Sequence, residues 1–277
     1  MYVVAITQLT HVVQVDDRRR DVVGLTSVDS RRLFVLRSSS EQQIEVYDTT
    51  TFKLQQTLNV VGLSDDWRNQ LTSCVINNCL YVSDYENATV YKIELTGHNE
   101  VSKWRVDGNR LSGLSINAAC NLLVTCDSDS KLLEYTPSGS LIREIELQLT
   151  SLPWHAIQLT SDQFVVCTSS DSDVVEVNSQ GQVVISYTNQ LQSTTQHQFN
   201  QPRHLAVDKN NECIFVADQF NARIVMLSRS LKCAREFNAS VDGSRLWPQC
   251  LYLNQSNSRL YVGSVNGLIF VFDIRRH

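Results

Sequence analysis

The chain has 277 residues, 42% of them apolar, and a formal net charge of −5. A chain of this size can bury a large core, and all-β chains of this length often form one domain, so we expect a single domain over residues 1–277. The sequence excludes a membrane helix, which needs about 18 consecutive apolar residues, and the acidic balance argues against nucleic acid, whose binding depends on neutralised phosphates.

The N-terminus and the cysteines favour a cytoplasmic or nuclear chain, unless a leader has been removed. The first residues have no basic lead, and their five-residue apolar stretch is shorter than the about 7–15 residues of a secretory signal core. The eight cysteines form no Cys-x-x-Cys pair and lie mostly in or beside apolar runs. We therefore expect free, buried thiols in a reducing compartment.

In chain order, two short β-rich runs recur six times with a period of about 45 residues, which is typical of a propeller with one blade per period. The first of these runs lies at 33–35, 80–82, 122–124, 164–166, 214–216 and 260–262. The second follows at 44–47, 90–93, 132–135, 174–177, 224–227 and 269–272. Their nearly constant spacing indicates six hairpins of equal length, because unrelated strands would not keep it.

Two further runs complete most of the predicted blades. An innermost strand is expected before each hairpin, at 22–25, 71–75, 111–114, 155–159, 204–207 and 250–253. A more polar run follows most hairpins, at 53–58, 102–106, 141–145, 183–187 and 233–237. Polar alternation is typical of an outer edge strand with one solvated face.

The sixth blade lacks a polar run, because the chain stops soon after its hairpin. Residues 11–15 have the missing pattern, and we predict that they form the outer strand of the last blade and close the ring. Residues 2–6 then form an additional strand or belong to an upstream element. The predicted fold is all-β, a six-bladed β-propeller of four-stranded antiparallel blades.

Residues 202–224, PRHLAVDKNNECIFVADQFNARI, resemble the NHL-repeat signature. That signature is a Pro-x-x-apolar-Ala-Val strand followed by an apolar-x-Val-Ala-Asp-x-x-Asn-x-Arg-Ile hairpin. Blade two keeps Asp84 and Asn87 of this pattern, and the other blades keep mainly the spacing. The chain therefore resembles the C-terminal propellers of tripartite-motif NHL proteins, which recruit protein or RNA targets.

We interpret the Asp-x-x-Asn-x-Arg residues of the hairpin as structural. Asn221 is expected in a left-handed turn conformation, and Asp218 and Arg223 are expected to meet across the hairpin. Asp84 and Asn87 are expected to do the same work in blade two.

The resemblance also implies where a ligand binds. In NHL propellers, the loops that enter the innermost strands and the turns between the second and third strands share one face, where ligands commonly bind. The partner-binding residues expected on this face are Arg68, Arg110, Trp154, His155, Arg203, His204, Gln249, Tyr85 and Phe220. The outer turns are acidic, and the alternative is that each of these side chains only solvates a turn. The long connections 59–70 and 188–201 serve either recognition or solvation.

A metal site is the sharper alternative. His155, His204 and Cys250 each lie two residues after a proline in successive blades, and His and Cys are good zinc ligands. Amidating lyases with NHL-type propellers hold a metal near the ring centre. The apolar residues that follow the two histidines are spaced differently, so the side chains need not converge. We predict no cofactor, no metal and no catalytic residue, and Gly-x-Ser-x-Gly, phosphate-loop and His-Glu-x-x-His motifs are missing from the sequence.

The predicted function is a non-enzymatic interaction scaffold, monomeric as an isolated domain, that binds a protein or peptide. A single-stranded RNA-binding NHL propeller is one alternative, disfavoured by the acidic charge. A metal-dependent lyase-like or hydrolase-like propeller enzyme is the other. RING, B-box and coiled-coil segments are missing from these residues, so ubiquitin-ligase activity would have to come from another part of a longer protein.

Overall fold

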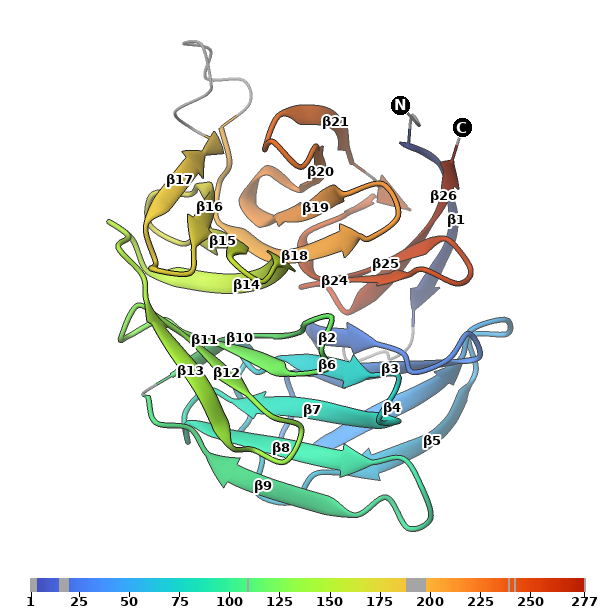
Figure 1. Ribbon diagram of the computed structural model, residues 1–277. Helices are drawn as coiled ribbons and strands as arrows, with labels where there is room; N and C mark the ends of the chain where they lie inside the picture. Colours follow the sequence, from blue (N-terminus) through green and yellow to red (C-terminus); the bar gives the residue numbers. More distant parts are fainter. Residues whose placement is uncertain are drawn as a thin grey trace.

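A computed structural model describes residues 4–14, 20–108, 110–187, 198–238, 240–241 and 243–276. Six four-stranded antiparallel sheets surround a common axis, so the chain is an all-β, six-bladed β-propeller, as predicted (Figure 1). Within these residues, no helix has the length and apolarity to cross a membrane.

In each of the first five blades, the four strands follow one another in chain order from the axis to the outer edge. Blade one contains β2 (Val22–Thr26), β3 (Arg32–Arg37), β4 (Gln43–Asp48) and β5 (Leu54–Asn59). Blade two contains β6 (Leu71–Cys74), β7 (Cys79–Asp84), β8 (Thr89–Glu94) and β9 (Val101–Arg105). Blade three contains β10 (Leu111–Ile116), β11 (Leu122–Cys126), β12 (Lys131–Tyr135) and β13 (Leu141–Glu146).

The second half of the ring repeats this order. Blade four contains β14 (Pro153–Thr160), β15 (Gln163–Thr168), β16 (Val174–Asn178) and β17 (Val183–Ser186). Blade five contains β18 (Pro202–Asp208), β19 (Cys213–Asp218), β20 (Arg223–Leu227) and β21 (Cys233–Phe237), with the 3-10 turn η2 (Gln219–Asn221) between β19 and β20. A small hairpin of β22 (Ser240–Val241) and β23 (Ser244–Arg245) leads to blade six and was not predicted.

Blade six joins the two ends of the chain. It contains β24 (Pro248–Asn254), β25 (Arg259–Ser264), β26 (Leu268–Arg276) and, outermost, β1 (Val4–Gln14). The predicted closure is confirmed, since β1 pairs with β26 in antiparallel register and β24 contacts β2 of blade one. Residues 4–6 extend this same strand, because β26 is long enough to pair Val4 with Arg276, while residues 2, 3 and 15 lie outside the described residues.

The apolar core lies between the blades. Six clusters of buried side chains are described, and each combines residues from two neighbouring blades around the ring. In β7, for example, Leu80 and Val82 pack toward blade one, whereas Cys79 and Tyr81 pack toward blade three. Alternation along one strand therefore buries both faces of a blade, and burial of each such side chain contributes about 1.5–3 kcal/mol.

The turn between the second and third strands contains a left-handed residue in all six blades. In each, a residue one or two positions before the third strand has a left-handed backbone, with φ between +48° and +79°; these residues are Gln42, Ala88, Ser130, Ser172, Ala222 and Gly267. The expectation of a left-handed Asn221 is wrong, because Asn221 lies in η2 and Ala222 follows it in the left-handed region. Asn221 instead directs its side chain to Asp218.

Candidate functional site

The inner strands of blades four, five and six each begin with a β-bulge. The pairing register shifts between Pro153 and His155 in β14, and the same shift recurs after Pro202 in β18 and after Pro248 in β24. A bulge turns its extra residue away from the regular alternation of the strand. The extra residues are Trp154, Arg203 and Gln249, and all three interact with Trp67 in the connection 59–70.

Connection 59–70 runs from β5 to β6 and is fixed to the hairpin of blade two. The backbone N–H and the hydroxyl of Ser64 donate to the buried carboxylate of Asp84, at 3.0 and 2.7 Å. Asn69 donates to the Ser64 carbonyl at 2.7 Å and accepts from the Tyr85 N–H at 2.9 Å. These bonds hold Trp67 over the ring centre, where it reaches residues of blades four, five and six.

Asp218 performs the same task in blade five. Its carboxylate accepts from the Asn200 N–H at 2.7 Å, from Asn221 Nδ2 at 2.8 Å and from Arg223 Nε at 2.6 Å. Asp218 is fully buried, and Asn200 belongs to the loop that enters β18. The Asp-x-x-Asn residues thus fasten the entry loop of a blade to its hairpin, which is a structural role. Blade two repeats the contact, with Asn87 donating to Asp84 at 2.9 Å.

Around Trp67, arginine and aromatic side chains alternate. The rings of Trp67 and Trp154 stack with centroids 5.7 Å apart and planes inclined by 18°. The guanidinium of Arg203 lies 4.8 Å from the Trp67 ring and 4.1 Å from the Trp154 ring. Arg68 lies 5.4 Å from Trp67 and 3.7 Å from Tyr85, and Arg110 lies 6.0 Å from Tyr85. We call these residues the arginine–aromatic ladder: Arg110, Tyr85, Arg68, Trp67, Arg203 and Trp154.

Amide side chains hold Arg203 in the ladder. Its Nε donates to Gln219 Oε1 at 2.9 Å and its Nη2 donates to Gln201 Oε1 at 2.6 Å. Gln219 in turn donates to Gln249, which donates to the Trp67 carbonyl at 3.2 Å. Burial lowers the pKa of Arg203 to about 10, and repulsion from Arg68 acts in the same direction. The guanidinium remains charged at neutral pH.

The other end of the ladder contains two carboxyl groups. Asp66 is buried and forms a two-point ion pair with Arg68, at 2.8 and 2.6 Å. Asp127 accepts from the Tyr85 hydroxyl at 3.0 Å, and burial raises the pKa of the Tyr85 hydroxyl and of the Asp127 carboxyl. The ladder therefore carries more positive than negative charge, whereas exposed carboxylates lie on the surrounding turns, as at Glu86.

The structure brings together most of the residues proposed from the sequence. Arg68, Trp154, Arg203 and Gln249 contact Trp67, and Tyr85 and Arg110 join the cluster through Arg68. Phe220 is 49% exposed on η2, next to Gln219. Sequence reasoning missed Trp67 itself, which is 37% exposed; its signal was a tryptophan beside an arginine within a long connection between blades.

His155 and His204 lie inside the ring and not on this face. Their rings stack with centroids 3.9 Å apart, and both side chains are buried. They occupy the same position as Cys250 after their bulges, so the three are equivalent in register. His155 nevertheless uses both ring nitrogens, toward the Leu114 carbonyl at 3.1 Å and the Leu205 N–H at 3.4 Å.

The buried thiol of Cys250 is directed to the Val22 carbonyl at 3.3 Å, and burial raises its pKa. Within the described part of the chain, no group of three or more His, Cys, Asp or Glu side chains is arranged to hold a metal ion. The sequence-based zinc hypothesis therefore has no preformed ligand set among these residues. Seven cysteines outside β21 are free thiols, and five of them are buried.

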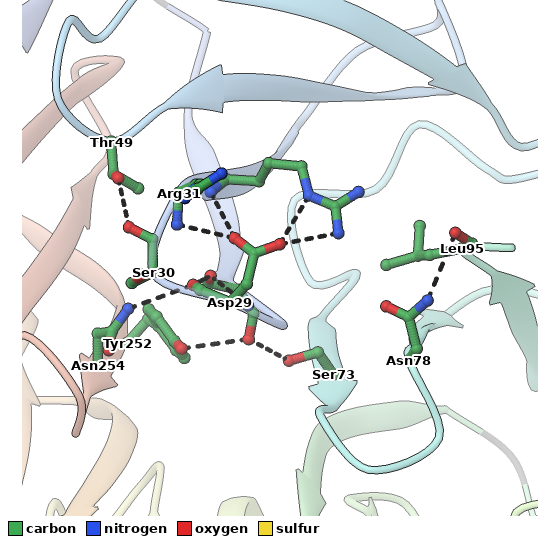
Figure 2. Close-up of polar contacts among 11 residues, drawn as sticks. Asp29, Ser30, Arg31, Thr49, Ser73, Asn78, Leu95, Tyr252 and Asn254 are labelled. Atoms are coloured by element: carbon green, nitrogen blue, oxygen red, sulfur yellow. Dashed lines mark hydrogen bonds and ion pairs between the residues drawn. The ribbon is translucent and has the colours of Figure 1, made fainter.

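A cavity of about 640 Å³ is lined by the inner strands of all six blades, with His155 and His204 among its lining residues, and at its mouth by the turns between first and second strands. Figure 2 shows one of these turns, in blade one. Tyr252 and Ser73 both donate to the Ser27 carbonyl, at 3.1 and 2.9 Å, and Asn254 approaches the Asp29 carbonyl at 3.5 Å. These polar side chains are hydrogen-bonded to the backbone, so fewer polar groups of the cavity lining are available to bind a ligand.

Comparisons with solved structures support the fold. The WD40 β-propeller domain of Doa1 is similar, with a TM-score of 0.63 and 12% identity over 96% of each chain. A catalytically inactive histidine-to-alanine variant of virginiamycin B lyase from Staphylococcus aureus, solved with quinupristin, has a TM-score of 0.65 and 10% identity over 99% of this chain and 89% of that chain. A streptogramin B lyase has a TM-score of 0.65 and 10% identity over 96% of this chain and 87% of that chain.

At these identities the likeness concerns the fold only. No family model matches the sequence, and a search of curated proteins gives no match. The neighbours include both a WD40 domain and lyases, and the propeller fold serves interaction and enzymatic proteins alike.

Proposed function

We propose that the chain is a non-enzymatic interaction module that binds a protein or peptide on the entry face, the side of the ring that carries connection 59–70, the bulges of the inner strands and the turns between second and third strands. The observation that carries this proposal is the stacked pair of Trp67 and Trp154 with Arg203 against both rings. Tryptophan and arginine at the centre of a face are the side chains that most often dominate binding energy. Bonds from the bulge residues and from Asp84 hold the cluster in place before a ligand arrives, which lowers the entropic cost of binding.

The entry loops and hairpins favour the NHL type within this function. In blades five and two, Asp218 and Asp84 join the hairpin to the entry loop of the same blade, and the NHL signature supplies these residues. We propose on this ground that the chain is an NHL-type interaction propeller. We also propose, from the sequence alone, that it is cytoplasmic and monomeric as an isolated domain. RNA is a less suitable ligand, because the outer turns of the face expose carboxylates.

Binding is favoured over lyase chemistry by the state of the central histidines. The virginiamycin B lyase variant is inactive after replacement of one histidine by alanine. In this chain, both nitrogens of His155 bond to the backbone, and His204 is stacked against it, with both rings at the wall of the axial cavity. Neither ring is placed to exchange a proton with a ligand on the entry face.

The test uses a displayed library of random peptides of about twelve residues, selected on the immobilised chain. Enriched peptides are synthesised and titrated against the wild type and against Trp67→Ala. We expect about 30-fold weaker binding by the variant, since loss of a central tryptophan typically costs about 2 kcal/mol. Circular dichroism and a melting curve establish that the variant is folded, and Trp154→Ala provides a second removal in the same stack.

The matched control is Ile76→Ser, which removes an exposed apolar side chain from the turn between β6 and β7, on the opposite face. Ile76 is 80% exposed and borders the mouth of the cavity. Binding should be unchanged in this variant. Peptides that depend on Ile76 and not on Trp67, or a selection that enriches nothing, would refute the proposed function.

A further inference from the structure

The ladder contains a buried positive charge without a carboxylate partner. Arg68 is neutralised by Asp66, but the partners of Arg203 are the amide oxygens of Gln201 and Gln219. Among the residues that the structure describes, no carboxylate lies within ion-pair distance of Arg203, although only 9% of this residue is exposed. Amide oxygens satisfy N–H groups but supply no net charge, and a buried charge without a counter-charge is costly.

One edge of the Arg203 guanidinium remains open. Nε and Nη2 are hydrogen-bonded, while Nη1 has no partner in the described part of the chain and is not among the fully buried unpaired atoms. The rings of Trp67 and Trp154 fix the guanidinium from the side. An arginine that is held in position but lacks one partner is ready to accept an anionic group without losing further conformational entropy.

Arg110 adds a second cation at the other end of the ladder. It is exposed, and the described residues contain no ion-pair partner for it. The titratable group that faces this end is Asp127, which is bonded to Tyr85 and whose pKa is raised by burial. The ladder thus stays short of negative charge after its own carboxyl groups are counted.

The surrounding turns have the opposite character. Asp65, Glu86 and Asp171 are exposed on the entry face, in the connection 59–70 and in the hairpins of blades two and four. A nucleic acid strand would bring several phosphates against these carboxylates, whereas a peptide can place one acidic group at the centre and basic groups at the rim. Each ladder ring also already contacts a guanidinium, which leaves less open aromatic surface for bases.

We infer that the entry face recognises an internal peptide segment in which one Asp or Glu side chain pairs with Arg203 and flanking Lys or Arg residues meet the acidic turns. The inference rests on the proposed function and names the chemistry of its partner. An ion pair in such a water-poor centre, with a preorganised arginine, gives specificity for a carboxylate over its amide.

The experiment uses enriched peptides with amidated C-termini, so that a terminal carboxylate cannot substitute for a side chain. Each Asp or Glu is replaced in turn by Asn or Gln. On the wild-type chain, one such replacement should weaken binding about tenfold or more, since it unpairs a partly buried arginine. On Arg203→Met the same replacement should change binding less than about threefold, because the partner of that carboxylate is gone.

Two further variants separate charge from fold. Arg203→Lys keeps the charge but loses the planar fork, and it should recover only part of the preference for the acidic peptide. Arg259→Met removes a partly buried arginine that is paired with Asp273 near the opposite face, and it should leave the preference intact.

The outcomes distinguish the two proposals. Peptides that require Trp67 but tolerate every acid-to-amide replacement would overturn the carboxylate inference and leave the interaction function standing. Peptides that bind without Trp67 would overturn both. Binding of a single-stranded RNA oligomer that exceeds peptide binding and weakens steeply with salt would overturn the inference in favour of a nucleic acid.

Discussion

The imidazole of His155 bonds to the inner strands on both sides of its own strand, β14. Its Nε2 lies 3.1 Å from the Leu114 carbonyl in β10, and its Nδ1 lies 3.4 Å from the Leu205 N–H in β18. One ring can donate to the carbonyl and accept from the N–H only when it is neutral, with the proton on Nε2. His155 therefore links three blades in a single protonation state.

This geometry predicts that acid lowers the stability of the propeller. Burial lowers the pKa of His155 to about 4, from 6.5 in the unfolded chain, and the pKa of the stacked His204 is lowered as well. Because the folded pKa lies below the unfolded one, the contribution of neutral His155 to stability is fully present above pH 6.5 and is lost as the pH falls toward 4. The loss approaches about 1.4 kcal/mol per pH unit for His155, or about 3 kcal/mol in total.

Urea unfolding at several pH values between 7.5 and 4 measures this loss. His155→Gln keeps a donor and an acceptor without a titrating ring, so its stability should be lower at neutral pH but should fall less on acidification. The control His98→Gln changes a histidine in the exposed turn between β8 and β9, and this variant should lose as much stability on acidification as the wild type. An acid loss of equal size in His155→Gln would assign the effect to other groups.

At the scale of the strands, the blades meet most closely where an inner strand carries glycine. A Cβ added to Gly113 in β10 would lie 2.8 Å from the Trp154 carbonyl oxygen and 2.9 Å from the His155 Cα. Gly24 in β2 is in the same situation against Leu71 of blade two. Small residues at these positions allow neighbouring inner strands to approach and to hold the bulge of the next blade in place.

Gly113→Ala should therefore disturb both stability and site. The extra methyl group must push against backbone atoms of β14, at a typical cost of about 2 kcal/mol for overpacking, and it should shift Trp154 out of its stack with Trp67. Denaturant unfolding measures the loss of stability, and tryptophan fluorescence reports the displacement of Trp154.

The matched substitution is Gly97→Ala, in the turn between β8 and β9. A Cβ at Gly97 meets nothing within 4 Å, and its φ of +65° leaves only a backbone cost of about 1 kcal/mol. If Gly113→Ala costs no more than Gly97→Ala and keeps the fluorescence of the wild type, close packing between β10 and β14 does not control the site.

The six-fold order of the whole molecule could be predicted from the sequence, because alternation of apolar residues is local and repeats with the period of a blade. The closing strand could be predicted too, since blade six lacked a polar run and residues 11–15 supplied one. The convergence on Trp67 could not, because it depends on bulges in three blades and on a connection from a fourth. Propensity predicts the left-handed conformation at Asn221, because Asn favours it. The structure has it at Ala222 instead, and the side-chain amide of Asn221 donates to Asp218.

Closure of the ring has a consequence for chain connectivity. Val4 and Arg276 are paired residues in β1 and β26, so the two ends of the described chain lie side by side (Figure 1). The packing between blades does not depend on where the chain starts, because each apolar cluster is formed by two neighbouring blades, including blades six and one on either side of the chain ends. A circular permutant that joins the two ends of this 277-residue chain through a short Gly/Asn linker should fold.

We predict that opening the chain between Gly97 and His98 preserves the propeller, because both residues are exposed in the turn between β8 and β9. The far-ultraviolet circular dichroism should match the parent, and the melting midpoint should fall by less than about 10 °C, equivalent to a few kcal/mol in a domain of this size. Opening between Leu80 and Tyr81, both fully buried in β7, should abolish folding because it cuts two of the inter-blade clusters. A permutant at 97/98 that fails to fold would mean that the pairing of β1 with β26 cannot replace an unbroken blade two.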